Sequence, residues 1–547
     1  MNIRIHVLGA IVLTSMAFGP VSRCDAQLGS TGSPSQISII PEPVTLERRE
    51  GQFRVTPHTH VAARGEARTE GIKLIDLLAP ATGYRLRVSE GLTASHNSIR
   101  LHIASSVRNR LGESGYELEV TSRSIEIAGG GPAGLFYGVQ TLRQLLPPAI
   151  LSETKVDAVA WTVPCVKITD HPRFGWRGLL VDPARHFIPI QHVKHFIDTM
   201  ALHKFNRLQI HLTDNEGWRI EIKEYPKLAE LGSQMDWNLI RRGGTGPRGF
   251  GFYTQDDIRD IVRYAADRHI TIVPEIEMPF HTGAAIVTHP QLGIAPGPLG
   301  ALPLEQRWAK TRGLIAPRAE TVAFLQDVLT EVMALFPSRH IHIGGDEANI
   351  GHWTNDPEMQ AQMKRLELAD AHALHSWFIK QMDAFLTSHG RRLVGWDEIL
   401  QGGLAPGATV MSWRGEQGGI AAANAGHDVV MAPTSHTYLD YYQGPRETEP
   451  LAIGGNLPLV TVYSYDPIPD AIAPDKAVHV LGVQGQLWGE YIATPEHLEY
   501  MAYPRAAAVA EVGWSPKAGK DYDDFLARLR RHVERLDARG VNYRPLD

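Results

Sequence analysis

From Arg177 to its end, the chain alternates between strand-like and helical segments, and this alternation restricts its fold more than any other feature. Eight short apolar or β-branched runs are separated by helical patterns or long loops. The predicted strands are Gly178–Val181, Arg207–Leu212, Ile270–Ile276, His340–Ile343, Arg392–Gly395, Thr409–Ser412, Asp428–Met431 and His479–Val483. This pattern predicts a (β/α)8 TIM barrel. An open doubly wound sheet would instead place a glycine-rich turn after its first strand, and residues 182–185 read Asp-Pro-Ala-Arg.

The connecting segments have helical periodicity. In the segment after the fourth strand, apolar residues recur at helical spacing, as at Ala373, Trp377 and Met382. The predicted helices of this region are Ile190–His203, Asp256–Arg268, Glu320–Phe336, Ala369–His389, Gly418–Ala425 and Glu496–Val512.

The preceding segment has a different pattern and predicts a smaller α+β domain. Strand-like runs occur at Gly51–Val55, Arg85–Val88, Ser98–Ala104, Tyr116–Thr121 and Ser124–Ala128, and helical patterns at Ala67–Leu78 and Gly134–Leu146. Several strands with two helices predict a sheet covered by helices on one face. The segment contains no cluster of acidic, histidine or cysteine residues. We therefore expect a non-catalytic domain at residues 37–170 and a catalytic barrel at residues 171–547, a division that suits a chain of 547 residues.

The N-terminus has the layout of a secretory signal peptide. Arg4 and His6 precede the apolar run Val7–Phe18, and small residues then lead to Ala26. We predict a signal peptide at residues 1–26, a linker at residues 27–36 and a secreted or periplasmic location in a bacterium. After cleavage Cys165 is the remaining cysteine, so the mature chain has no internal disulfide. The sequence predicts no transmembrane anchor in the mature chain.

Residues 340–347 read His-Ile-His-Ile-Gly-Gly-Asp-Glu and end in two adjacent carboxylates. The alternating residues predict a strand, and Gly344 and Gly345 then release the backbone from side-chain constraint. Asp346 and Glu347 therefore come at the carboxyl end of the strand, where a barrel collects its working residues. Adjacent carboxylates repel each other, so the pair predicts a site that transfers a proton and stabilises a developing positive charge.

Charged or aromatic residues follow every predicted strand. In chain order they are Arg185, Asp214, Glu277 with His281, Asp346 with Glu347, Trp396, Trp413, Tyr438 with Asp440, and Trp488 with Glu490. Flat aromatic walls and directional polar groups suit a sugar ring, whose faces are C–H and whose rim carries hydroxyls. The net charge of −6 argues against nucleic acid as a partner, because phosphate binding needs a basic patch.

Six ordered motifs resemble glycoside hydrolase family 20, the β-N-acetylhexosaminidases. They are Asp182-Pro-Ala-Arg-His-Phe187, His211-Leu-Thr-Asp-Asn-Glu-Gly-Trp-Arg219, Pro274-Glu-Ile-Glu-Met-Pro-Phe-His281, His342-Ile-Gly-Gly-Asp-Glu347, Gly395-Trp-Asp-Glu398 and Leu487-Trp-Gly-Glu490. The resemblance runs from about Ile39 to the C-terminus. It implies an exo-acting, retaining enzyme that removes terminal β-linked GlcNAc or GalNAc from oligosaccharides or glycoconjugates. It implies no metal and no cofactor.

The resemblance also implies a mechanism in which the substrate's own 2-acetamido oxygen attacks the anomeric carbon. Glu347 would act as the acid and then the base, and Asp346 would bind the acetamido N–H. Tyr438 would donate to the acetamido oxygen. Trp396, Trp413 and Trp488 would box the acetamido group and the ring. The other implied roles are hydroxyl binding by Arg185, Glu490 and Asp440, and adjustment of Glu347 by Asp214 and His281.

Two departures from the family pattern concern the wall of the site. Glu277 stands where the family commonly has Asp, and Phe280 where it commonly has Gly.

The same rim of charged and aromatic residues would also suit two other functions. A metal-dependent hydrolase could use His340, His342 and Asp346, since alternating histidines on one strand face can hold zinc. The second alternative is a protein that binds carbohydrate at this rim without hydrolysing it.

Overall fold

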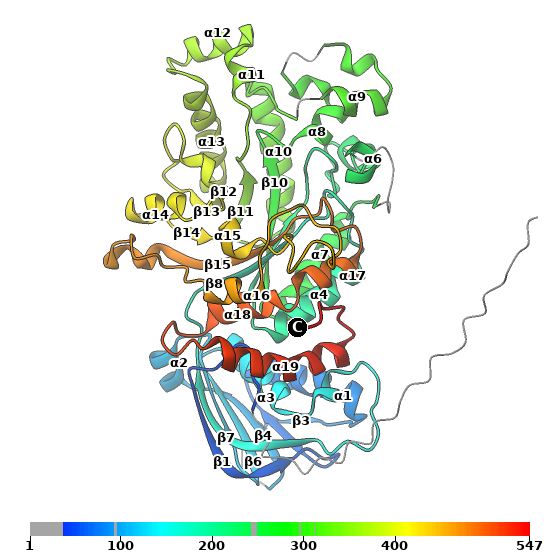
Figure 1. Cartoon of the computed structure of the whole chain (residues 1–547), viewed down its shortest axis with the longest axis vertical. Coiled ribbons are helices and arrows are strands. Elements are labelled where there is room, and N and C mark those ends of the chain that lie inside the picture. The colour runs from blue at the N-terminus through cyan, green and yellow to red at the C-terminus, as the bar shows by residue number, and fades with distance from the viewer. Residues whose placement is uncertain (1–36, 92–95, 242–248, 295–296, 312, 547) are drawn as a thin grey trace, which may run out of the picture. The chain divides into compact units, whose positions relative to one another are not determined.

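The computed structural model describes residues 37–91, 96–241, 249–294, 297–311 and 313–546. The predicted signal peptide and linker lie outside the described residues. Beyond Ser38, the chain contains a mixed sheet followed by a closed barrel (Figure 1). Within the described residues, no helix combines the length and the apolar character needed to cross a membrane.

The eight predicted barrel strands are all present and all pair in parallel. They are β8 (Trp176–Val181), β9 (Arg207–His211), β10 (Thr271–Met278), β11 (His340–Gly344), β12 (Arg392–Trp396), β13 (Thr409–Ser412), β14 (Val429–Met431) and β15 (Val480–Leu487). The sheet closes where β15 pairs with β8, from Gly482 opposite Trp176 to Leu487 opposite Val181. This closure confirms the TIM barrel and excludes the open sheet. It also brings the carboxyl ends of all eight strands to one rim.

Helices between the strands surround the barrel (Figure 1). They include α4 (Ile190–Leu202), α7 (Gln255–Ala266), α10 (Ala319–Leu335), α13 (Ala371–Ser388), α14 (Gln417–Asn424) and α18 (Arg505–Trp514). Local sequence defines their ends. At the start of α7, the Thr254 hydroxyl accepts the Asp257 N–H while the Asp257 carboxylate accepts the Thr254 N–H. Side chains such as Trp176, Leu180 and Met411 pack together as a buried apolar cluster of the barrel.

The single helix predicted at Glu496–Val512 is wrong. The structure divides it into α17 (Pro495–Ala502) and α18, which are separated at Tyr503 and Pro504. Proline has no backbone N–H and its ring clashes with the preceding turn, so it ends a helix. The apolar periodicity continues across the break and therefore hides it.

The smaller domain is a seven-stranded sheet of order β1-β7-β5-β6-β4-β2-β3. The strands are β1 (Thr45–Arg54), β2 (His60–Ala63), β3 (Val88–Ser89), β4 (Ser98–Ile103), β5 (Tyr116–Val120), β6 (Ser124–Gly129) and β7 (Thr162–Asp170). Helices α1 (Ala67–Thr82) and α3 (Pro132–Leu145) cover one face, as predicted (Figure 1).

Strand boundaries in this domain differ from the prediction. The run Arg85–Val88 contributes only the first residue of β3. The predicted run Gly51–Val55 covers only the end of β1, and no predicted strand corresponds to its antiparallel partner β7. Nearly all of β1 is exposed, so it carries no apolar alternation from which a half-buried strand could be read.

Candidate active site

A cavity of about 180 Å³ opens at the carboxyl ends of the barrel strands, and every predicted site residue lines it. These residues are Arg185, Asp214, His281, Asp346, Glu347, Trp396, Trp413, Tyr438, Asp440, Trp488 and Glu490. They come from eight successive strand ends, so no local segment of the chain could gather them. Barrel closure alone brings them into one cavity.

Asp346 and Glu347 follow β11 through a turn that only glycine can make. Gly344 and Gly345 have φ of +70° and +93°, a region that disfavours other residues. A Cβ at Gly344 would lie 1.7 Å from Oε2 of Glu277. The turn separates the two carboxylates: the Asp346 side chain is 12% exposed, whereas the Glu347 side chain is 53% exposed. Adjacent residues therefore occupy different environments.

The two carboxyls differ in proton affinity as a result. Burial raises the pKa of Asp346 to about 6, although the charge of His281 opposes this rise. For Glu347 the pKa is lowered, chiefly because His281 Nε2 donates a hydrogen bond to Oε2 at 3.1 Å. Neighbouring carboxyls whose environments separate their pKa values are typical of sites that divide acid and base roles.

His281 links Glu347 to Asp214. Its Nδ1 lies 3.2 Å from Asp214 Oδ1, on the opposite side of the ring from the Nε2 that faces Glu347. Burial would lower the pKa of His281, but Asp214 and the other carboxylates raise it well above its ordinary value. The ring is therefore an imidazolium that donates at both nitrogens.

Arg185 is the centre of a buried ion-pair network. Its guanidinium lies 2.8 Å from both Asp182 and Asp214, 3.3 Å from Glu216 and 3.7 Å from Glu490. Four carboxylates in distinct directions hold the planar guanidinium in one orientation. Arg185 thus has the structural ion pairs expected of a barrel rim and also lines the cavity.

Aromatic rings form the walls. The centroids of Trp396 and Trp488 are 5.6 Å apart, and Trp413 stacks with Tyr438 at 6.2 Å. Trp396 also donates its indole N–H to Glu275 at 3.0 Å, which fixes its ring. Such rings present flat apolar faces to a ligand.

Five cavity-lining carboxyl oxygens have no hydrogen-bond partner among the described residues. They are Asp346 Oδ1, Asp440 Oδ1, Glu490 Oε2 and both carboxyl oxygens of Glu277, and each is buried. Burial raises the pKa of Asp440 well above its ordinary value and also raises that of Glu490. Buried polar atoms are normally paired. Unpaired atoms that face a cavity indicate a ligand with several hydrogen-bonding groups.

Comparison with known proteins decides the family. Residues 174–517 match the family model "Glycosyl hydrolase family 20, catalytic domain", and residues 36–171 match "Glycosyl hydrolase family 20, domain 2". The chain belongs to glycosyl hydrolase family 20. It is therefore a glycoside hydrolase by family, fold and the position of its site.

Similar proteins are named as hexosaminidases or as an acetylglucosaminidase. A β-hexosaminidase of Porphyromonas gingivalis is 45% identical over 510 residues, and the match covers 93% of this chain and 64% of that protein. The solved Streptomyces plicatus β-hexosaminidase, a mutant in complex with GlcNAc as product, is 34% identical with a TM-score of 0.81 over 94% of this chain and 98% of its own. The Vibrio harveyi exo β-N-acetylglucosaminidase in complex with N-acetylglucosamine is 31% identical with a TM-score of 0.80, and covers 94% and 80% respectively.

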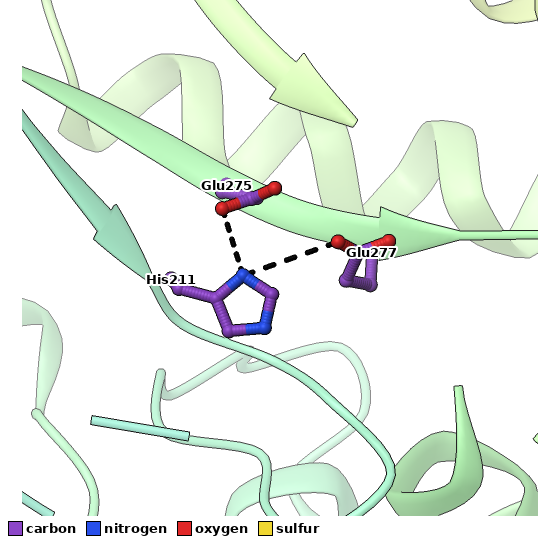
Figure 2. A group of neighbouring side chains, drawn as sticks. All are labelled: His211, Glu275 and Glu277. Carbon is purple, nitrogen blue, oxygen red and sulfur yellow. Dashed lines mark hydrogen bonds and ion pairs between the residues drawn. The ribbon is translucent and has the colours of Figure 1, made fainter. Parts of the chain in front are cut away.

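In this family 20 chain, His211 lines the cavity beside Glu277, but the sequence pattern assigned a site role to neither His211 nor its buried partner Glu275. His211 Nδ1 lies 2.7 Å from Glu275 Oε2 and 3.9 Å from Glu277 Oε1 (Figure 2). Its Nε2 lies 2.8 Å from Asp214. Burial would lower the pKa of His211, but Glu275 and the other carboxylates raise it to about 10. The available signal was the presence of charged residues at buried positions of otherwise apolar strands.

The described residues hold two groups of histidine and carboxylate side chains with the spacing of metal ligands. They are His211 with Glu275 and Glu277, and His281 with Asp346 and Glu347. Each histidine faces carboxylates through both ring nitrogens: His211 faces Glu275 and Asp214, and His281 faces Asp214 and Glu347. The set proposed for a metal-dependent hydrolase is not among these groups. His342 faces Glu275 at 2.9 Å, whereas His340 packs against Trp176.

Proposed function

We propose that this family 20 enzyme is an exo-acting β-N-acetylhexosaminidase that hydrolyses terminal β-linked GlcNAc or GalNAc with retention. The observation that carries this proposal is the adjacent pair Asp346 and Glu347 with unequal proton affinities. A retaining enzyme with its own nucleophile needs two carboxyls on opposite sides of the bond, about 5 Å apart. Neighbours in the chain are poorly placed for that. The pair suits a substrate that supplies its own nucleophile.

Glu347 is the acid of the first step and the base of the second. In the free enzyme it is ionised and accepts a hydrogen bond from His281. When a sugar covers this half-exposed side chain, loss of solvent favours its neutral form. The proton then passes from His281 Nε2 to Glu347, and from there to the leaving oxygen. Asp214 holds the imidazole in place for this transfer.

Asp346 acts on the substrate's amide. Its ionised carboxylate accepts the acetamido N–H and stabilises the positive charge as the acetamido oxygen attacks the anomeric carbon and an oxazolinium ion forms. Tyr438 donates its hydroxyl to that oxygen. Burial raises the pKa of Tyr438 well above its ordinary value, so the phenol keeps the proton that it donates.

The remaining cavity residues bind the sugar. Trp396, Trp413 and Trp488 enclose the acetamido group and the ring. Arg185 and Glu490 face the 3- and 4-hydroxyls and Asp440 the 6-hydroxyl, so that sugar hydroxyls satisfy the unpaired oxygens of Glu490 and Asp440. The relatives from Streptomyces plicatus and Vibrio harveyi were solved with GlcNAc and N-acetylglucosamine, the sugar class that this arrangement fits.

Rates on aryl glycosides test the activity. We expect release of p-nitrophenol from the β-glycosides of GlcNAc and GalNAc and none from the β-glucoside, which lacks the acetamido nucleophile. A thiazoline mimic of the oxazoline should inhibit at least 10²-fold more tightly than GlcNAc, as transition-state-like ligands do. Binding of the sugar without hydrolysis would instead support a carbohydrate-binding protein. Weak binding of the thiazoline to an active enzyme would exclude the substrate-assisted route.

We also propose that the chain is exported, with cleavage after Ala26, and that residues 37–170 form a domain without catalytic residues. The charged and apolar pattern of residues 1–26 supports export. The change of family model between residues 171 and 174 supports the division. Mass spectrometry of the full chain expressed in a bacterium should find a mature N-terminus at Gln27 outside the cytoplasm. A chain that keeps Met1 in the cytoplasm would contradict export.

A further inference from the structure

Glu277 is a carboxyl that the proposed mechanism leaves without a role. It lies near the end of β10, whose neighbour β11 leads to Asp346, and the next residue, Met278, pairs with Gly344. Glu277 is 2% exposed and lines the cavity. Neither of its carboxyl oxygens has a hydrogen-bond partner among the described residues.

The groups around Glu277 cannot stabilise an ionised carboxylate. His211 Nδ1 is 3.9 Å from Oε1 and is already engaged by Glu275 at 2.7 Å. On the other side, Oε2 rests against the bare backbone of Gly344. The Gly344 N–H is directed to His342 Nδ1 instead. An anion in this position would be buried without any donor, which is unfavourable.

The surrounding charges favour a neutral form. Three carboxylates face Glu277, namely Asp346, Glu275 and Asp214. The facing cations are His281 and His211, and both donate at each ring nitrogen to other carboxylates. Burial first, and then the charge of Asp346, raises the pKa of Glu277 well above its ordinary value.

Asp346 lacks a hydrogen-bond donor, whereas a neutral Glu277 lacks an acceptor. Its Oδ1 is buried in the same cavity without a donor, and its Oδ2 lies 3.6 Å from His281, too far for a good hydrogen bond. A neutral Glu277 carries one O–H that needs an acceptor, and Asp346 has one oxygen that needs a donor. The two groups come from the ends of neighbouring strands and line one cavity.

We propose that Glu277 remains a neutral carboxylic acid throughout the reaction and donates its O–H to Oδ1 of Asp346. Glu277 is thus a positioning residue: it keeps Asp346 ionised and oriented toward the substrate's amide. This inference rests on the role proposed for Asp346. The proton stays on Glu277. Of the two carboxyls Glu277 and Asp346, only Asp346 therefore carries a negative charge where the oxazolinium ion forms.

The pH dependence of kcat/KM on the p-nitrophenyl β-glycoside of GlcNAc tests this inference with two neutral variants. Glu277→Gln keeps a donor, so the pKa of the acid limb, which reports Asp346, should stay within about 0.3 units. Glu277→Met has similar length but no donor. Its acid limb should rise by about one unit and its kcat should fall about tenfold. If Glu277 were ionised, both variants would remove a negative charge and lower the acid-limb pKa, which would overturn the inference.

Infrared spectroscopy gives a readout that needs no substrate and no activity. At about pH 8, where Asp346 is ionised, the difference spectrum of wild type minus Glu277→Gln should contain the carbonyl stretch of a protonated carboxylic acid, shifted in D2O. A carboxylate band in its place would refute the neutral form, even if Glu277→Met failed to fold. A protonated band in a chain without hexosaminidase activity would refute the proposed function and leave the neutral Glu277 standing.

Discussion

Replacing Glu347 by Gln should lower kcat/KM on a β-linked GlcNAc disaccharide by about 10³-fold, the contribution of a positioned general acid. Glutamine has nearly the same shape but cannot give a proton to the leaving oxygen. On a dinitrophenyl glycoside, whose leaving group needs little protonation, the loss should be about tenfold or less. Steady-state rates on the two substrates measure this difference.

The contrast between substrates separates acid catalysis from a general loss of structure. Glu534→Gln is the matched control, because Glu534 is exposed on the C-terminal helix α19 (Tyr522–Arg539). It should leave both rates unchanged. Equal losses on both substrates in Glu347→Gln would show that Glu347 is not the proton donor.

Replacing Asp346 by Asn should lower kcat on the p-nitrophenyl glycoside by about 10²- to 10³-fold, the range for removing one electrostatic contact to a transition state. Asparagine removes the negative charge that stabilises the oxazolinium ion. The effect should fall on kcat more than on KM, because that charge develops only as the acetamido oxygen attacks.

The same variant should change the pH profile. The pKa of Asp346 is raised to about 6, so wild-type activity should fall as pH drops through 6 and Asp346 takes up a proton. An amide does not titrate, and the acid limb near pH 6 should therefore disappear in Asp346→Asn. A limb that persists at the same pH would assign this titration to another group.

Most of the barrel was predictable because its strands carry a strong local pattern. Short β-branched runs such as Thr409–Ser412 matched the structure at both ends. The gathering of site residues was also predictable, since a residue directly after a parallel strand must reach the common rim. Trp413 and Trp488 could therefore be assigned to the site although a single tryptophan is usually part of a core.

The predictions failed where the apolar pattern of the side chains does not indicate the conformation of the backbone. Pro504 interrupts a segment whose side chains keep helical periodicity. Strand β1 is exposed along nearly its whole length, so its pairing with β7 has no counterpart in its apolar pattern. The polar group of His211 and Glu275 was missed because alternation says which residues are buried, not which buried residues meet.

The sequence by itself determined the order of the strands, the residues that follow each of them and the resemblance to glycoside hydrolase family 20. All of these depend on spacing along the chain. Only the tertiary structure decided how strongly each group holds its proton. Asp346 and Glu347 are neighbours in sequence, yet burial raises the pKa of one while contact with His281 lowers that of the other. Proton affinity depends on solvent exposure and on charges brought from other strands, and folding alone creates both.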